Sequence, residues 1–301
     1  MNTELLTLPD DVSLGEITVY LPGKAESSGT LQARRDITIP SDAKVFITLS
    51  QEVCDNMELL DLIPKRLLEN GIWVADKNLD HSKFTFLAVL QLRALAIASS
   101  SGLTLRQLGE LTREPMLEHL ALQHTPFSPR EYSWIAELSQ LKTLYLEGTD
   151  ADDRCLPYIA TLQRLESLGL ERSKITDRAA QAIWQMPRIK NVGLSRCRIG
   201  NEALRGAGRC ASLIGLHLDE TDVGDEGIVR LVDEGLQNGQ MLSLLSLSYC
   251  QRITNRSVIH LAAVPSMRVL SVNATTVSLE AASYLKRCIP ECHIFTSAGH
   301  L

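Results

Sequence analysis

A six-residue pattern, L-x-x-L-x-L, recurs eight times and constrains this chain more than any other feature. All 24 residues at its template positions are aliphatic or Met, although only 45% of the whole chain is apolar. So regular a period indicates a repeat architecture in which stacked turns share one continuous core. The successive spacings are 25, 24, 24, 24, 24, 29 and 25 residues, and the copies begin at Leu92, Leu117, Leu141, Leu165, Ile189, Leu213, Leu242 and Met267.

Each turn carries a second set of marks after the strand pattern. Three residues beyond the last template position stands a small polar or thiol residue, which can satisfy the backbone where the chain leaves the sheet. A helix-capping pair and apolar residues at three-residue spacing follow, so each turn predicts a strand and then a short helix. The polar or thiol residues are Ser100, Thr125, Thr149, Ser173, Cys197, Thr221, Cys250 and Thr275, and the capping pairs include Ser128-Pro129, Asp152-Asp153, Thr176-Asp177 and Thr254-Asn255.

Two turns carry a family resemblance. LSLLSLSYCQRITNRSVIHLAAVPS, from Leu242 to Ser266, and ERSKITDRAAQAI, from Glu171 to Ile183, resemble the leucine-rich-repeat family. The match is to its cysteine-containing and ribonuclease-inhibitor-like branches, whose turns contain L-x-x-L-x-L-x-x-(C/T/N)-x-x-I-T-D. The resemblance implies an α/β leucine-rich-repeat solenoid of about ten turns. Its curved parallel sheet would form the concave side, and its short helices the convex side.

The repeat pattern also suggests where the parts of the chain begin and end. Ile72-Trp73-Val74 falls in register with Leu95-Ala96-Ile97, and Ile47-Thr48-Leu49 stands 25 residues earlier. We expect an N-terminal β-cap (1–43) with strands joined by the loop GKAESSG, two degenerate repeats (44–91), eight repeats (92–291) and a C-terminal cap (292–301). We expect the β-cap to cover Trp73, with a role as a contact anchor as the alternative.

Composition narrows the possible partners. The formal net charge of −6 argues against a nucleic-acid or anionic-membrane partner, because both attract clustered Lys and Arg. No apolar run is long enough to span a membrane, and the N-terminus does not resemble a signal peptide. The seven cysteines form no C-x-x-C pair and several occupy predicted core positions, which favours reduced thiols in a cytoplasmic protein. We expect a monomer, with a dimer formed through a cap as an open alternative.

Sequence motifs of catalytic sites are absent. The chain has no H-E-x-x-H, G-x-S-x-G or P-loop pattern. Cys288, Cys292 and His293 stand close enough to suggest metal ligands, but we expect Cys288 in the core of its helix, and a fourth ligand is missing. The chain is therefore expected to be no enzyme and to need no metal or cofactor.

The concave face carries the candidate site. Residues between the template positions point away from the core, since side chains alternate along a strand. Gly169 and Gly193 are expected to leave a shallow trough between Tyr145 and His217. Tyr and Arg amid charged residues are typical of binding surfaces. A polar face that binds nothing is the alternative. The site residues are Tyr145, Glu147, Glu171, Arg172, Arg196, His217, Asp219, Glu220 and Tyr249.

Glu147 and Glu171 also suggest a catalytic carboxylate pair. An open sheet should neither exclude water nor raise a carboxyl pKa, so we disfavour catalysis. We instead predict a non-catalytic protein–protein interaction module that binds a partner with a basic patch through the concave face.

Two further functions stay open. The first is substrate recognition in a ubiquitin-ligase-like complex, because the F-box branch shares these repeats, although no F-box stands in the first ninety residues. The second is a bacterial effector acting in a host cell, which the absence of a signal peptide permits.

Overall fold

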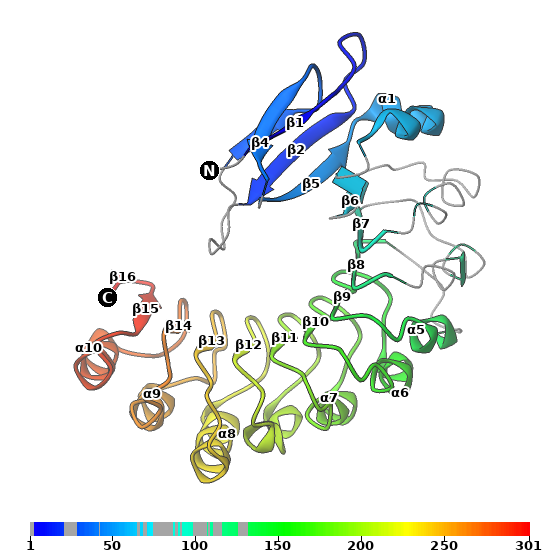
Figure 1. Cartoon of the computed structure of the whole chain (residues 1–301). Helices are drawn as coiled ribbons and strands as arrows, with labels where there is room; N and C mark the ends of the chain where they lie inside the picture. Colours follow the sequence, from blue (N-terminus) through cyan, green and yellow to red (C-terminus); the bar gives the residue numbers. More distant parts are fainter. Residues whose placement is uncertain are drawn as a thin grey trace. The chain divides into compact units, whose positions relative to one another are not determined.

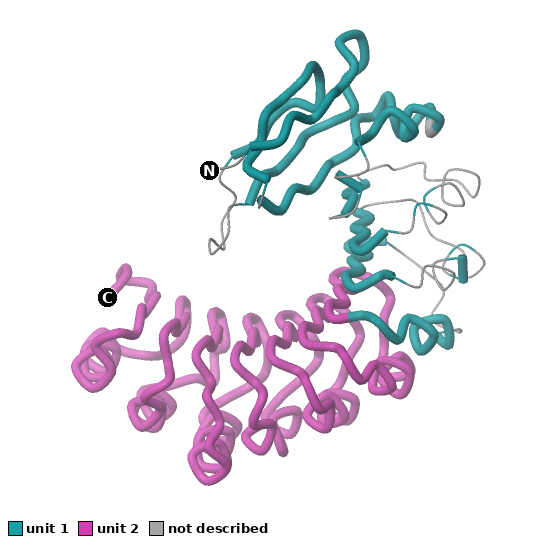
Figure 2. The backbone as a smooth tube through the Cα atoms, viewed as in Figure 1, with its two compact units in different colours: residues 1–141 teal, residues 142–301 magenta. Residues whose placement is uncertain are grey.

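The computed structural model divides into two compact units, residues 1–141 and 142–301 (Figure 2). It describes residues 3–20, 29–41, 43–64, 67–68, 71–74, 87, 90, 92–98, 107, 109–110, 116–125 and 132–301. Three predicted features lie outside these residues: most of the loop GKAESSG, the polar position Ser100 and the capping pair Ser128-Pro129. Among the described residues, no helix combines the length and the apolar character that crossing a membrane requires.

The first unit contains a mixed sheet in the order β3-β2-β5-β6-β7-β8. Strands β5 to β8 are parallel, with Ile47 paired to Ile72, Ile72 to Leu95 and Leu95 to Leu120, which confirms the predicted register. β2 runs antiparallel to β5 and covers the edge of the parallel strands. The elements are β1 (Thr3–Leu6), β2 (Gly15–Tyr20), β3 (Gly29–Gln32), β4 (Ile37–Pro40), β5 (Lys44–Leu49), α1 (Gln51–Asp55), η1 (Met57–Leu62), β6 (Ile72–Val74), β7 (Ala94–Ala98), β8 (His119–Gln123) and α5 (Ser133–Glu137).

The second unit is a regular stack of turns. Strands β9 to β15 form a parallel sheet on the inner side of its curve, and its helices lie outside (Figure 1). The last strand, β16, closes the sheet antiparallel to β15. The strands are β9 (Thr143–Tyr145), β10 (Ser167–Gly169), β11 (Asn191–Gly193), β12 (Gly215–His217), β13 (Leu244–Ser246), β14 (Val269–Ser271), β15 (His293–Thr296) and β16 (Gly299–His300). The helices are η2 (Asp153–Cys155), α6 (Leu156–Ile159), α7 (Asp177–Ile183), η3 (Asn201–Leu204), η4 (Ala207–Arg209), α8 (Asp225–Asn238), α9 (Asn255–Leu261) and α10 (Leu279–Cys288).

The template leucines form the core of this stack. Leu144, Leu168 and Leu216 expose 0%, 1% and 0% of their surface, which confirms the predicted strand register. The five extra residues between Leu213 and Leu242 lengthen α8 to 14 residues and leave the pairing of β12 with β13 intact. The 29-residue spacing is accommodated here because a convex helix accepts an insertion more easily than a sheet does.

A buried column of hydroxyl and thiol groups lies where each strand ends. The Oγ1 atoms of Thr149, Thr221 and Thr275 donate to the carbonyl three residues earlier, at 2.7, 2.7 and 2.8 Å. Cys197 and Cys250 instead donate from Sγ to carbonyls of the preceding turn, at 3.0 and 3.1 Å. The expectation that these residues satisfy the turning backbone is therefore confirmed for Thr149, Cys197, Thr221, Cys250 and Thr275.

A second column links the helix starts of successive turns. The Asp177 carboxylate accepts the Gly200 N–H at 2.6 Å, and the Asn201 side-chain oxygen accepts the Gly224 N–H at 2.7 Å. We call this series the Asx ladder. Its five acceptors are Asp153, Asp177, Asn201, Asp225 and Asn255, which bind the N–H groups of Thr176, Gly200, Gly224, Thr254 and Ser278.

The ladder corrects part of the capping prediction. Asp152 and Thr254 cap their own helices, but the Thr176 side chain makes no cap hydrogen bond. The second members of the three described pairs, Asp153, Asp177 and Asn255, instead accept hydrogen bonds from the next turn.

Two side chains differ from their expected environments. Trp73 keeps 46% of its surface exposed, so the expectation that the N-terminal cap covers it is wrong. Cys288 is exposed rather than buried, because it is the last residue of α10, where the helix ends. The other six cysteines are buried, and no cysteine forms a disulfide.

Candidate interaction surface

Seven of the nine predicted site residues line one shallow depression of about 380 Å³ on the sheet side of the second unit. Ser195, Ser246 and Ser248 complete its wall. The seven are Glu147, Glu171, Arg172, Arg196, Asp219, Glu220 and Tyr249. Tyr145 and His217 belong to the same strand layer but do not line the depression.

The expected glycine trough is not empty. A β-carbon at Gly169 would lie 2.6 Å from Cδ1 of Tyr145, and one at Gly193 would overlap the Glu171 carboxylate. The side chains of Tyr145 and Glu171 therefore lie over the glycines and fill the space that they leave. This corrects the predicted open trough, because side chains from neighbouring turns occupy the room that the glycines leave.

This packing changes the ionisation of the site. Burial raises the pKa of Glu171 above its usual range, and the nearby Glu147 and Asp219 carboxylates add to that rise. Burial also raises the pKa of Tyr145 and lowers that of His217. The expectation that an open sheet leaves carboxyl pKa values unchanged is therefore wrong for Glu171.

Asp219 is held by the strands around it. Its carboxylate accepts Ser246 Oγ at 2.5 Å, the Ser248 N–H at 2.7 Å and Ser195 Oγ at 3.3 Å. Its own N–H donates to Ser195 Oγ at 3.0 Å. Because three donors already use its oxygens, Asp219 links neighbouring turns and contributes less to an exposed acidic surface than Glu147 and Glu171 do.

The rim of the depression is built on left-handed backbone. Non-glycine residues with positive φ are uncommon, yet here one stands at the same position of each turn. The left-handed bend ends the strand and turns the chain towards the buried hydroxyl column. The residues in the second unit are Gly148, Arg172, Arg196, Glu220, Tyr249 and Ala274, with φ from 52° to 65°. This left-handed conformation was not predicted from the sequence. The one sequence feature that indicated it was the glycine at position 148.

Charges on the rim are only partly paired. Arg196 forms an ion pair with Glu220, donating from Nε at 2.7 Å. Tyr249 exposes 57% of its surface, and Arg172 is also exposed. The lining contains four carboxylates and two guanidinium groups, an excess of two negative charges when all are ionised. Such a surface attracts a cationic partner. Among the described residues, no group of three or more His, Cys, Asp or Glu side chains is arranged to hold a metal ion.

Comparison with solved structures identifies the fold. An internalin (inlF) from Listeria monocytogenes matches with a TM-score of 0.56 at 16% sequence identity, over 80% of this chain and 70% of the internalin chain. An internalin C2 (inlC2) from the same organism gives a TM-score of 0.49 at 18% identity, over 79% and 86% of the two chains. No family model and no curated protein matches the sequence. The fold is therefore an α/β leucine-rich-repeat solenoid. The likeness to inlF shows this, together with the parallel sheet and the short helices.

Proposed function

We propose that this chain is a non-catalytic protein–protein interaction module, which binds a partner with a basic patch through the depression on its concave face. The observation that carries the proposal is the gathering of Glu147, Glu171, Arg172 and Tyr249 around one hollow. A recessed surface with an exposed tyrosine and arginine is typical of protein interfaces. Its excess of acidic groups favours lysine and arginine side chains from the partner.

The size of the surface supports a protein rather than a small ligand. A standard interface buries roughly 800 Å² on each partner. The depression spans β9 to β13, and exposed Tyr249 and Arg172 on its rim extend it. It is shallow and open and is lined by charged residues, serines and one tyrosine, unlike the enclosed apolar cavities that bind drug-sized molecules.

Two finer assignments accompany this function. The thiols of Cys197 and Cys250 in the buried hydroxyl column support a place in the cysteine-containing, ribonuclease-inhibitor-like branch. None of the seven cysteines forms a disulfide, which supports a reducing, cytoplasmic location. We also propose that the chain is a monomer, which light scattering at several protein concentrations would test.

Site-specific cross-linking tests the binding face. A photo-reactive benzoylphenylalanine replaces Tyr249 on the depression or, as a matched control, Tyr158 on the helix side; these tyrosines expose 57% and 37% of their surface. In lysate of the native cell, one partner band should form with the first variant and not with the second. The band should weaken with rising salt, because ionic steering is screened. Equal cross-linking from Tyr158, or from Tyr158 alone, would place the interface elsewhere.

A further inference from the structure

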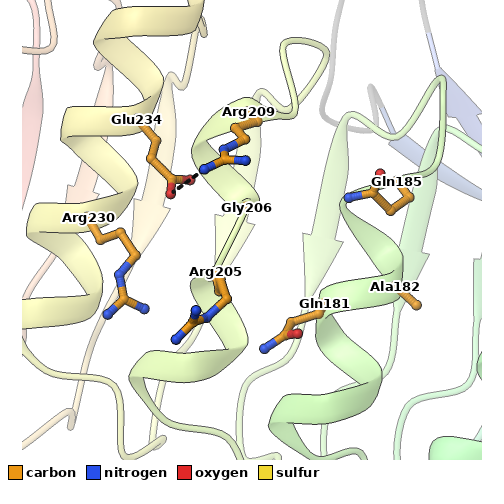
Figure 3. A pocket seen from close by; sticks show the side chains of 8 residues that line it. All are labelled: Gln181, Ala182, Gln185, Arg205, Gly206, Arg209, Arg230 and Glu234. Carbon is orange, nitrogen blue, oxygen red and sulfur yellow. Dashed lines mark ion pairs between the residues drawn. The ribbon is translucent and has the colours of Figure 1, made fainter.

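A second hollow, of about 630 Å³, lies on the helix side of residues 142–301. We call it the arginine groove. Three segments provide its lining, as Figure 3 shows: α7 with the residues that follow it, the η3–η4 segment, and α8. The lining residues are Gln181, Ala182, Gln185, Arg205, Gly206, Arg209, Arg230 and Glu234.

The groove exists because one turn lacks a regular helix. Between α7 and the 14-residue α8, the helical segments are only the short η3 and η4, which are joined at Gly206. Gly206 has a φ of 86°, and no atom lies within 4 Å of the position its β-carbon would take. The middle of the groove therefore has open space where a helical turn would place side chains.

Hydrogen bonds to both neighbouring turns fix the floor. Trp184 donates from Nε1 to the Ala203 carbonyl at 2.7 Å, which ties η3 to the α7 turn. Gln240 donates from Nε2 to the Ala207 carbonyl at 2.8 Å, which ties η4 to the end of α8. Gly208 allows close approach, since a β-carbon there would lie 2.6 Å from the Leu231 carbonyl. A groove held in this way binds without first having to be ordered.

Three guanidinium groups reach the groove and share two carboxylates. Glu202 pairs with both Arg205, at 2.6 Å, and Arg230, at 3.3 Å. Arg209 lies 3.6 Å from Glu234, which is beyond hydrogen-bond distance, and its side chain is 72% exposed. Each guanidinium has five N–H donors, so the groove holds a positive excess and many donors without acceptors in the described residues.

We propose that the arginine groove binds an acidic segment of a protein, whose carboxylates are bound by Arg205, Arg209 and Arg230. A guanidinium binds a carboxylate through two parallel hydrogen bonds, and partly exposed pairs such as Arg209–Glu234 are weak enough to exchange. Gln181 already donates to the Glu202 carbonyl at 3.0 Å, so its side-chain oxygen can accept a peptide N–H.

The lining favours a peptide over a nucleic acid. Single-stranded nucleic acids are bound by aromatic side chains that stack on bases, and none lines the groove. The groove and the concave depression share no residue, so this site is independent of the function proposed above.

Fluorescence anisotropy with acetylated, fluorescein-labelled hexaglutamate tests the groove. The double variant Arg209→Glu/Arg230→Glu should raise the Kd at least about tenfold, since charge-assisted hydrogen bonds become repulsive contacts. The milder Arg209→Gln/Arg230→Gln guards against loss of folding, which circular dichroism would reveal, and should raise the Kd by a smaller factor. Arg256→Glu, an exposed residue of α9 outside the groove, should change the Kd less than about twofold.

Three results would overturn the proposal. The first is the absence of saturable hexaglutamate binding at about 50 mM salt, where ionic attraction is strong. The second is an unchanged Kd in both double variants while Arg256→Glu weakens binding. The third is tighter binding of a short oligothymidylate than of hexaglutamate at equal salt, which would identify a nucleic-acid site.

Discussion

The carboxylate of Glu171 lies over Gly193, in the space that a β-carbon at position 193 would occupy. A glycine in one turn thus accommodates an acidic side chain of the turn before it. Tyr145 lies over Gly169 in the same manner, one turn earlier. Both side chains are partly removed from water by this packing, and both have raised pKa values as a result.

Glu171→Gln should stabilise the protein more at neutral than at acidic pH. The folded state raises the pKa of Glu171 above its ordinary 4.5, so it binds the proton more tightly than the unfolded chain does. The stabilisation from that proton is complete below the unfolded pKa and is lost as the pH rises through the folded pKa. Thermal denaturation of both proteins at about pH 4 and pH 7 measures the difference. A difference that does not change with pH would contradict the buried carboxylate.

Glu147→Lys should slow association with the partner and leave the melting temperature nearly unchanged, because Glu147 is only half-buried on the rim of the depression. The effect should shrink as salt screens the charges. Binding kinetics at two salt concentrations provide the measurement. Arg178→Glu, at an exposed residue of α7, is the control. Glu171 is less suited to this reversal, since its packing over Gly193 adds a folding effect.

Ala274→Gly should leave stability unchanged or increase it by up to about 1 kcal/mol. Ala274 has a φ of 52°, and the left-handed region costs an L-residue roughly 1–2 kcal/mol. Part of that gain is offset by the greater freedom of glycine in the unfolded chain. The matched control is Ala281→Gly in α10, which should lose about 1 kcal/mol because glycine disfavours helices. Urea denaturation compares them, and equal losses would argue against strain at position 274.

Asp225→Ala should destabilise the second unit by about 1–3 kcal/mol, because it leaves partly buried donors without an acceptor. The Asp225 carboxylate accepts the Thr254 N–H at 2.9 Å, Thr254 Oγ1 at 2.5 Å and Ser257 Oγ at 2.5 Å. Asp222→Ala, an exposed carboxylate of the same turn, is the control and should change little. Similar urea midpoints for the two variants would show that the Asx ladder contributes nothing measurable.

The strand layer could be predicted because its periodicity repeats a physical requirement. Each template leucine must be buried in every turn, so positions such as Leu144 and Leu216 are fixed by the pattern alone. The 29-residue spacing also agrees with the long α8, since an extra segment cannot enter the parallel strands without breaking their pairing. Domain boundaries within the first 91 residues stay a prediction.

The details of the site could not be predicted, because they depend on contacts between turns. Strand alternation puts Asp219 on the free face, but only the structure shows that three donors occupy its oxygens. The same holds for Glu171, whose burial depends on the glycine of the next turn. For Cys288 the sequence predicted burial where the structure shows exposure. Its spacing suggested a core position, but the residue ends its helix and is exposed.

The Asx ladder makes the solenoid able to grow by duplication. Every link needs a side-chain acceptor from one turn but only a backbone N–H from the next, and Gly200, Gly224 and Thr254 all provide that N–H. A copied turn would bring its own Asp or Asn and would find a donor in whichever non-proline residue follows. At the Asx ladder, a change in the number of turns by whole units therefore needs no matching substitution in the neighbouring turn. Each copy also adds new concave surface.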